Sequence, residues 1–263
     1  MSELKDMKAV ILCGGEGTRL REETEYKPKP LVTVGGLPIL WHIMKTYSAY
    51  GIREFVLCLG YKGEMIKQFF LTHELMHNDF TIHLGDRVHD KIHKDEPAED
   101  WAITFVDTGL KSMTGLRLKR IERYIGTDNF FATYGDGLAD LDIRETLTTH
   151  RRLNATATLT GVHPRSKFGL IQPGKGGLVE KFVEKPRLYD YMNGGYYVFR
   201  KDIFDYLEAD ESCVLETKLE MLAGKKQLGM HKHEGFWYAM DTYKDFLELN
   251  KMWDEGVRPW KKW

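Results

Sequence analysis

Three glycines follow a short apolar run near the start of the chain, and they could gather backbone N–H groups around an anion. Residues 10–12 (Val-Ile-Leu) are apolar and rich in β-branched side chains, which is typical of a buried strand. Gly14, Gly15 and Gly17 come directly after this run. Glycine lets the backbone turn sharply and point several N–H groups at one position, which suits a phosphate. We therefore expect a phosphate-binding loop here.

Arg19 and Lys29 add two long cations close to this loop. Pro28 and Pro30 restrict the backbone around Lys29, which suits a lysine that must reach one fixed point. The loop lacks the Gly-Lys-Ser/Thr ending of a P-loop, and its Gly-Gly-x-Gly spacing differs from that of dinucleotide-binding loops. Spacing alone predicts a bound nucleotide or sugar phosphate. The alternative is a glycine turn among solvated charges.

A third candidate group, Asp136, lies just beyond the predicted strand at residues 130–134, between Gly135 and Gly137. Ligands of open α/β sheets bind beyond the carboxyl ends of strands, where this carboxylate could reach a metal on a phosphate. Mg²⁺ prefers one or two carboxylates together with substrate oxygens and water. We expect Asp136 to bind Mg²⁺, and we interpret the nearby acids at positions 140 and 142 as solvated turn residues.

Alternating strands and helices must position these groups. Their order implies parallel strands with right-handed crossovers, so we expect an α/β fold: a Rossmann-like mixed, mostly parallel sheet flanked by helices, with a helical C-terminus. Strands are predicted at residues 52–59, 102–106, 130–134, 155–161, 168–172, 179–183 and 196–199, and helices at 38–50, 64–71, 118–125, 203–207, 215–222 and 244–253.

We expect one domain over residues 1–263. Its nucleotide-binding half would span about 1–153 and its sugar-phosphate-binding half about 154–263. The charged, histidine-rich residues 72–100 look like an inserted segment, for which contact with another subunit, in a homo-oligomer, is one hypothesis.

Composition limits the partners of the chain. Its 263 residues carry a formal net charge of −1, so no global basic field would hold nucleic acid. No apolar run approaches about 18 residues, so we expect no membrane span. The polar N-terminus argues against a signal peptide. Three widely spaced cysteines indicate reduced thiols in a cytoplasmic protein.

The loop and the segments beyond it carry a family resemblance. The loop consists of Leu12, Cys13, Gly14, Gly15, Glu16, Gly17, Thr18 and Arg19, and Lys-Pro-Lys-Pro-Leu follows at residues 27–31. This signature resembles that of sugar-1-phosphate nucleotidyltransferases. The similarity covers nearly the whole chain, and later segments, such as residues 134–142 and 240–242, favour the branch that uses CTP.

The resemblance implies a reaction and its cofactor. A cytidylyl group would pass from CTP to α-D-glucose 1-phosphate, giving CDP-glucose and pyrophosphate with Mg²⁺. In that family CDP-glucose feeds deoxysugars of bacterial surface polysaccharides. The same transfer with a different sugar 1-phosphate, or with UTP or dTTP, remains the alternative.

The resemblance also implies roles for single residues on the nucleotide side. The loop residues 12–19 and Gly135 would contact the nucleotide, while Arg19, Lys29 and Asp136 would be catalytic. Ser112 and Arg117 match positions that contact the nucleotide from a flexible loop, although Leu116 departs from the usual glycine. Asp241 would be the second Mg²⁺ carboxylate. Taken alone, Asp241 could equally cap the helix predicted near residue 244.

On the sugar side, the implied residues come from the second half of the chain. Glu184 and Lys185 resemble a Glu-Lys-Pro segment in which the lysine would hold the sugar phosphate and the glutamate a sugar hydroxyl. Asn193 and Gly194 would face the sugar.

Two other functions compete with this prediction. Residues 73–77 (His-Glu-Leu-Met-His) match the short His-Glu-x-x-His pattern of zinc hydrolases, although no clear third ligand accompanies it. A nucleotide-sugar sensor without catalysis could use the same fold, but it would be expected to lose a cation or a carboxylate of the site. Arg19, Lys29, Asp136 and Asp241 are all present.

Overall fold

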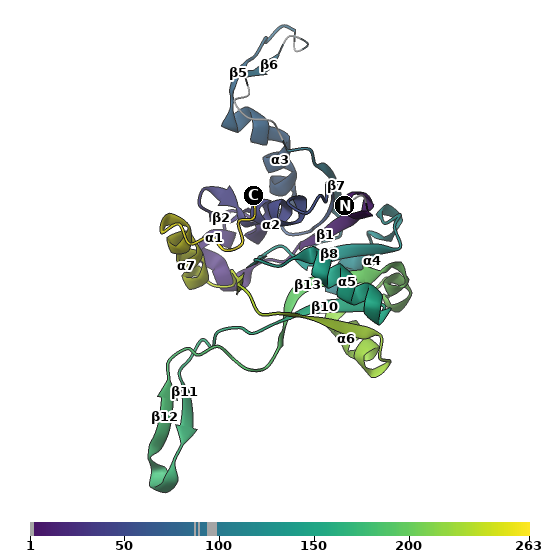
Figure 1. Ribbon diagram of the computed structural model, residues 1–263. Helices are drawn as coiled ribbons and strands as arrows, with labels where there is room; N and C mark the ends of the chain where they lie inside the picture. The colour runs from purple at the N-terminus through teal and green to yellow at the C-terminus, as the bar shows by residue number, and fades with distance from the viewer. Residues whose placement is uncertain (1–2, 87, 89, 94–98) are drawn as a thin grey trace.

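The computed structural model describes residues 3–86, 88, 90–93 and 99–263, and a seven-stranded sheet forms its centre (Figure 1). The strands lie in the order β14-β10-β13-β8-β1-β4-β7. Only β13 runs antiparallel to its neighbours, β8 and β10, so the sheet is mixed and mostly parallel, as predicted. Its strands are β1 (Lys8–Cys13), β4 (Glu54–Leu59), β7 (Ala102–Asp107), β8 (Asn129–Tyr134), β10 (Ala157–Val162), β13 (Met192–Arg200) and β14 (Leu228–His233).

Helices cover both faces of this sheet. They are α1 (Arg21–Thr24), α2 (Ile39–Ser48), α3 (Gly63–His77), α4 (Thr114–Lys119), α5 (Ile143–Leu153), α6 (Leu215–Gly224) and α7 (Tyr243–Asp254). Side chains alternate along β1, as they must in a strand. Ile11 and Cys13 pack in the core with α2, α3, α5 and α7, whereas Val10 and Leu12 pack in the core with α4 and α6.

The parallel pairing of β1 and β8 sets the position of the glycine loop. Leu12 pairs with Tyr134 at the carboxyl ends of these strands, and the N–H of Gly135 donates to the Leu12 carbonyl at 3.1 Å. The loop after β1 and the Gly-Asp-Gly turn after β8 therefore leave the sheet at the same edge.

A second pairing brings the distant C-terminal region to this edge. Strand β9 (Gly137–Ala139) pairs antiparallel with β15 (Trp237–Ala239), in the register Gly137 to Ala239. The Met240 N–H then donates to the Asp136 carbonyl at 2.9 Å. Asp241 is thereby held beside Asp136, although about a hundred residues separate them in the chain.

Several elements differ from the sequence prediction. The pattern missed α5, β9, β14 and β15, and the predicted helix at 203–207 is a 3₁₀ helix (Lys201–Tyr206). The helix predicted at 118–125 is also wrong, because α4 ends at Lys119 and a separate 3₁₀ helix (Glu122–Tyr124) follows. The interpretation of Asp140 and Asp142 as solvated turn residues is wrong. Asp142 caps α5 by accepting from the Arg144 N–H at 2.9 Å. Asp140 accepts from the Phe236 N–H at 2.7 Å, which ties the turn before β15 to the strand end of β9.

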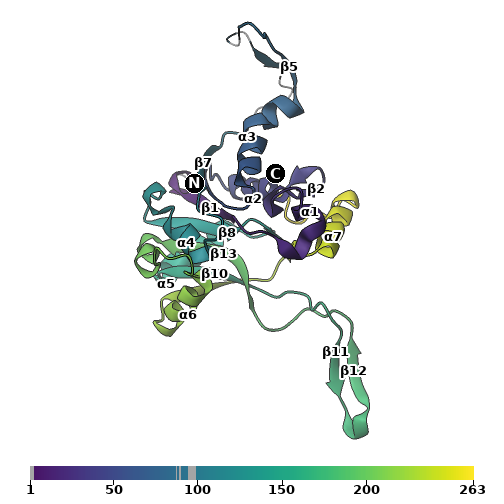
Figure 2. The same cartoon turned by 180° about the vertical axis from the view of Figure 1, so that it is seen from behind.

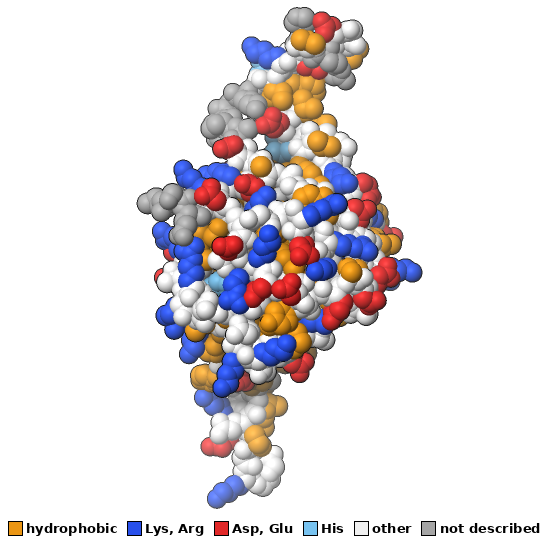
Figure 3. Space-filling view, turned by 90° about the vertical axis from the view of Figure 1, so that its right-hand side faces the viewer, with side chains coloured by type: hydrophobic (Ala, Val, Ile, Leu, Met, Phe, Trp, Pro, Cys, Tyr) orange, Lys and Arg blue, Asp and Glu red, His pale blue; other side chains and the backbone are white. Residues whose placement is uncertain are grey.

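Two hairpins project from opposite ends of the body (Figures 1 and 2). One, formed by β5 (Asp79–Thr81) and β6 (Lys91–His93), follows α3, and the other consists of β11 (Leu170–Pro173) and β12 (Val179–Val183). Basic and acidic side chains are interspersed on the face in Figure 3, in line with the small net charge. Among the described residues, no helix has the length and apolar character needed to span a bilayer.

The His-Glu-x-x-His segment lies on the outer part of α3. His73 packs on Trp41, with ring centroids 4.2 Å apart, and its backbone carbonyl is hydrogen-bonded to Nδ1 of His77 at 2.8 Å. Of the other histidines in the inserted segment, His89 lies outside the described residues. The three cysteines are free and buried, as expected of reduced thiols.

Candidate active site

A pocket of about 350 Å³ lies where the glycine loop meets the Gly-Asp-Gly turn. Most of the residues predicted to bind a nucleotide line it together. Its lining consists of Leu12, Cys13, Gly14, Gly15, Gly17, Thr18, Arg19, Lys29, Pro30, Ser112, Met113, Thr114, Arg117, Tyr134, Gly135, Asp136 and Asp241.

The glycine loop has its shape for two reasons. Gly17 has a φ of 65°, in the left-handed region where a side chain would strain the backbone. A Cβ on Gly14 would stand 2.0 Å from the Arg117 guanidinium, so a side chain there would displace the guanidinium from its hydrogen bonds. Gly15 has no atom within 4 Å of its Cβ position and faces open space at the pocket. The loop thus leaves room for a ligand against bare backbone.

Four charged side chains meet on one side of the pocket. The Lys29 ammonium lies 2.6 Å from Oδ2 of Asp136 and 2.9 Å from Oδ1 of Asp241. Arg19 reaches Asp241 from the solvent side, with a nitrogen–oxygen distance of 3.0 Å. Residues from three distant parts of the chain therefore form one alternating cluster of charge.

Burial and pairing oppose each other in this cluster. Burial disfavours charged Lys29, but Asp136 and Asp241 outweigh that effect and raise the pKa of Lys29. Burial also disfavours charged Asp241, yet the hydrogen bond and charge of Lys29, followed by Arg19, lower the pKa of Asp241. Both groups are thus held in their charged forms around neutral pH.

Asp241 faces the pocket and does not cap the following helix, because its neighbour Thr242 does so. Thr242 is the N-cap of α7, and its hydroxyl accepts from the Asp245 N–H at 3.3 Å while Asp245 accepts from the Thr242 N–H at 2.8 Å. The alternative in which Asp241 itself caps this helix is wrong.

The two carboxylates fit the way in which Mg²⁺ binds with phosphates. Asp136 and Asp241 both lie against a single nitrogen, that of Lys29, so their side chains converge on one position. Among the described residues, no group of three or more His, Cys, Asp or Glu side chains could hold a metal. Mg²⁺ commonly takes only one or two carboxylates and completes its shell with substrate phosphate and water. The donor set is therefore suited to a metal that arrives with a nucleotide.

Arg117 lies at the pocket, but the protein itself occupies its hydrogen-bond donors. Its guanidinium donates to the carbonyls of Gly14, Leu59, Gly109 and Leu110 and to the Thr108 hydroxyl, at 2.8–3.2 Å. The residue is 5% exposed. This geometry makes Arg117 a support that fixes the back of the glycine loop. Ser112, also buried, accepts from Arg120 at 3.1 Å.

The residues predicted for the sugar phosphate lie outside the pocket lining. Glu184 and Lys185 follow β12, are exposed, and approach each other at 3.5 Å. Lys185 has a φ of 47°, an uncommon conformation for a residue with a side chain. Asn193 is linked to the lining through Tyr197, because its amide donates to the Tyr197 hydroxyl at 2.7 Å and that hydroxyl donates to the hydroxyl of Tyr134 at 3.4 Å. The Gly194 carbonyl accepts from the Trp237 indole at 2.8 Å.

Sequence reasoning missed four lining residues, Pro30, Met113, Thr114 and Tyr134. Two of them had a positional signal. Tyr134 is the last residue of the strand before the Gly-Asp-Gly turn, and Thr114 lies within the loop that holds Ser112. Pro30 follows Lys29 directly in the chain.

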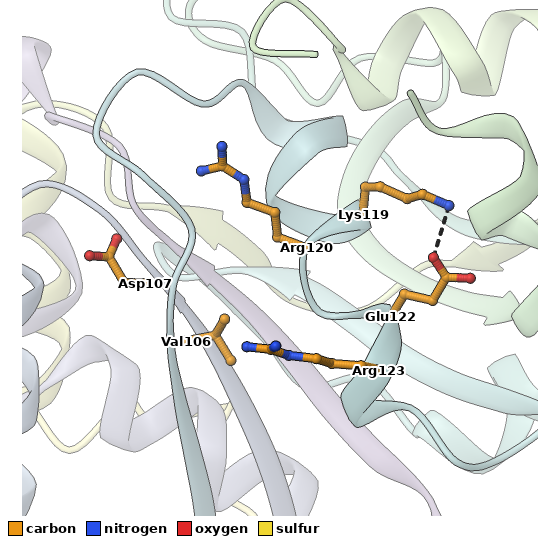
Figure 4. Close-up of a pocket in the computed structure, with 6 residues that line it drawn as sticks. All are labelled: Val106, Asp107, Lys119, Arg120, Glu122 and Arg123. Carbon is orange, nitrogen blue, oxygen red and sulfur yellow. Dashed lines mark ion pairs between the residues drawn. The ribbon is translucent and has the colours of Figure 1, made fainter. Parts of the chain in front are cut away.

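A second hollow, of about 500 Å³, lies beyond β7 and is lined by Val106, Asp107, Lys119, Arg120, Glu122 and Arg123 (Figure 4). Several of its charged side chains are engaged with one another or with the backbone. Lys119 pairs with Glu122 at 2.8 Å, as the dashed line in Figure 4 marks. Arg120 donates to the Thr108 carbonyl at 2.7 Å. We therefore place the function in the glycine-loop pocket.

Comparisons with known proteins agree with this geometry. A model of the nucleotidyl transferase family matches residues 8–255. Two relatives named glucose-1-phosphate cytidylyltransferase, from Salmonella typhimurium and Salmonella typhi, are each 46% identical over 259 residues, covering 98% of this chain and 100% of each relative. The crystal structure of HddC from Yersinia pseudotuberculosis shares the fold, with a TM-score of 0.67, 22% identity, and coverage of 94% of this chain and 99% of that one. The chain belongs to the nucleotidyl transferase family.

Proposed function

We propose that this chain transfers the cytidylyl group of CTP to α-D-glucose 1-phosphate and releases pyrophosphate. The observation that carries the proposal is the meeting of the glycine loop, Arg19, Lys29 and Asp136 at one pocket. The names of the two Salmonella relatives support CTP and glucose 1-phosphate as the substrates. The charged cluster by itself supports nucleotidyl transfer in general.

The reaction brings two anions together, and the groups of the site could offset the repulsion between them. A phosphate oxygen of the sugar 1-phosphate forms a bond to the α-phosphorus of CTP, and the bond from that phosphorus to pyrophosphate breaks. Loop N–H groups around Gly15 would hold phosphate oxygens, and Lys29 and Arg19 would offset the charge that gathers around the phosphorus. Mg²⁺, held by Asp136 and Asp241, would supply further positive charge when it is bound.

Lys29 can serve the reaction because its two acidic partners do not use all of its N–H donors. Its ammonium has three donors, and two of them are directed at Asp136 and Asp241. A third donor is left for a phosphate oxygen. With 11% of its side chain exposed, the lysine is only weakly screened by water, so its charge acts strongly at short range.

Pyrophosphate release from each of the four common nucleoside triphosphates, with a panel of sugar 1-phosphates, tests the proposal. We expect the highest kcat/KM for CTP with glucose 1-phosphate, and a requirement for Mg²⁺. Highest activity with another pair would establish the alternative, in which the same transfer uses a different nucleotide or sugar. No release with any pair, in protein shown to be folded, would contradict nucleotidyl transfer.

The proposal extends to self-association. The hairpin β11–β12 and its approaches expose large apolar side chains, which is uncommon unless another surface covers them. These residues are Phe168, Leu170, Ile171, Leu178, Val179, Phe182, Val183 and Tyr189. We expect light scattering to report a homo-oligomer. A monomer at micromolar concentration would contradict this part of the proposal.

A further inference from the structure

Three polar side chains outside the charged cluster form a hydrogen-bonded group at the edge of the nucleotide pocket. Glu216, the second residue of α6, accepts from the Thr114 hydroxyl at 2.9 Å and also from the Tyr134 hydroxyl. Thr114 and Tyr134 both line the pocket. One carboxylate from a distant helix thus engages the two pocket hydroxyls that the sequence reasoning missed.

The carboxylate fixes the direction of both hydrogen bonds. An ionised carboxylate can only accept, and a hydroxyl has a single proton to donate. Thr114 and Tyr134 must therefore both donate to Glu216. Toward a ligand in the pocket, each hydroxyl can then only accept a hydrogen bond.

The surrounding donors reinforce this direction. The Leu215 N–H donates to the Thr114 hydroxyl at 2.9 Å. The Tyr197 hydroxyl donates to that of Tyr134 at 3.4 Å, and the Asn193 amide donates to Tyr197 at 2.7 Å. All of these hydrogen bonds run toward Glu216. Each pocket hydroxyl accepts one of them and has one lone pair left.

We propose that Glu216 determines the base preference of the pocket by making Thr114 and Tyr134 hydrogen-bond acceptors. The inference rests on the proposed function, since it takes a nucleotide as the ligand. Cytosine carries an exocyclic amino donor at position 4, where uracil and thymine carry a carbonyl acceptor. Hydroxyls that act as acceptors bind the amino group of cytosine. They disfavour the carbonyl of uracil or thymine, because two acceptors that face each other are both left without a donor.

The other parts of a nucleotide are poorer candidates for the group that contacts Thr114 and Tyr134. Phosphate oxygens are acceptors and anions, so neither the hydroxyl lone pairs nor the Glu216 charge suits them. They fit the opposite chemistry of Arg19, Lys29 and the loop N–H groups. Sugar hydroxyls both donate and accept, so they would bind whichever way Thr114 and Tyr134 pointed. Only the base makes the direction of these hydroxyls decisive.

Replacing Glu216 with glutamine tests the inference at nearly constant shape. In Glu216→Gln, one side-chain oxygen becomes an N–H₂ donor, so one of the two hydroxyls must accept from it and turn its own proton toward the pocket. Because Glu216 is exposed, we expect this variant to fold. Glu220→Gln, one turn further along α6 and also exposed, is the matched control for the loss of charge.

Two readouts keep the inference separate from the proposed reaction. Equilibrium binding of CTP and UTP, each with Mg²⁺ and without sugar phosphate, measures base preference alone. Pyrophosphate release with glucose 1-phosphate measures the reaction. We expect the wild type to bind CTP more tightly than UTP, and Glu216→Gln to reduce that ratio at least about tenfold, partly through tighter UTP binding. Glu220→Gln should keep the wild-type ratio.

Several results would overturn the inference even if the chain proves to be a cytidylyltransferase. These are equal binding of CTP and UTP by the wild type, an unchanged ratio in Glu216→Gln, or an effect confined to the KM for glucose 1-phosphate. Tyr134→Phe supplies a second test, because it removes one acceptor. It should weaken CTP binding while leaving UTP binding unchanged or tighter, and an equal loss for both nucleotides would contradict the inference.

Discussion

Replacing Lys29 with alanine removes a side chain that contacts both acids of the site. Its ammonium lies 2.6 Å from Asp136 and 2.9 Å from Asp241, and 11% of the side chain is exposed. The variant leaves two carboxylates facing each other with Arg19, 71% exposed, as the nearby cation on Asp241. A phosphate that enters this site would meet net negative charge where the wild type offers a cation.

The size of the effect follows from that geometry. A fixed donor directed at developing negative charge contributes about 3–4 kcal/mol to the transition state, or a factor of about 10²–10³ in rate. Loss of the cation should also let Asp136 and Asp241 repel a bound phosphate. We therefore expect turnover of Lys29→Ala at saturating CTP and glucose 1-phosphate to fall by a factor on the order of a hundred or more.

The assay is steady-state pyrophosphate release, with thermal unfolding measured in parallel to show that the variant is folded. Lys27→Ala is the matched control, because Lys27 pairs with Glu23 at 3.0 Å on the surface and does not belong to the pocket lining. The control should retain near wild-type turnover. If folded Lys29→Ala turned over within a few-fold of the wild type, Lys29 would have no place in the mechanism.

Three further predictions concern the metal, the loop support and pH. Asp136→Asn should raise the Mg²⁺ concentration for half-maximal turnover at least about tenfold, because one of two carboxylates is lost; normal metal dependence would mean that the ion is held elsewhere. Arg117→Met should lower the free energy of unfolding in urea by about 2–4 kcal/mol, because it leaves buried carbonyls without donors, whereas native stability with a raised KM for CTP would place the guanidinium on the nucleotide. Burial, followed by repulsion from Arg200 and Arg151, lowers the pKa of His150 from 6.5 to about 4, so the unfolded chain takes up this proton first as the pH falls. Stability should therefore drop by up to about 2 kcal/mol between pH 6.5 and 5, and His150→Gln should flatten that slope; equal slopes in both proteins would contradict this assignment.

Local patterns were sufficient for the parts of the site that lie next to strands. The run at residues 10–12 and the strand before Asp136 are short, apolar and followed at once by glycine, so their type and their ends could be predicted. Parallel strands end at the same edge of a sheet, which is why the glycine loop and Asp136 were expected together. Each strand and its loop could be predicted from residues close in sequence, and the rule for parallel strands then places the two loops at one edge.

The remaining features depend on pairings between distant segments. Asp241 reaches Asp136 only because β15 pairs with β9, and these strands are three residues long, which is too short for a periodic signal. The sequence of β14 alternates poorly because it contains two histidines and a lysine, so its place in the sheet comes from packing against β10. For Arg117, the family resemblance implied a nucleotide contact, whereas burial beneath Gly14 directs its donors to carbonyls.

A crystal structure with CTP and Mg²⁺ tests the central claim most directly. The claim is that bare loop backbone, two cations and a metal-binding acid neutralise the phosphates at one place. We predict triphosphate oxygens within hydrogen-bond distance of the Gly15 N–H and of Arg19 or Lys29, and the metal ion on Asp136. A triphosphate bound far from Gly15, Arg19 and Asp136 would contradict the claim.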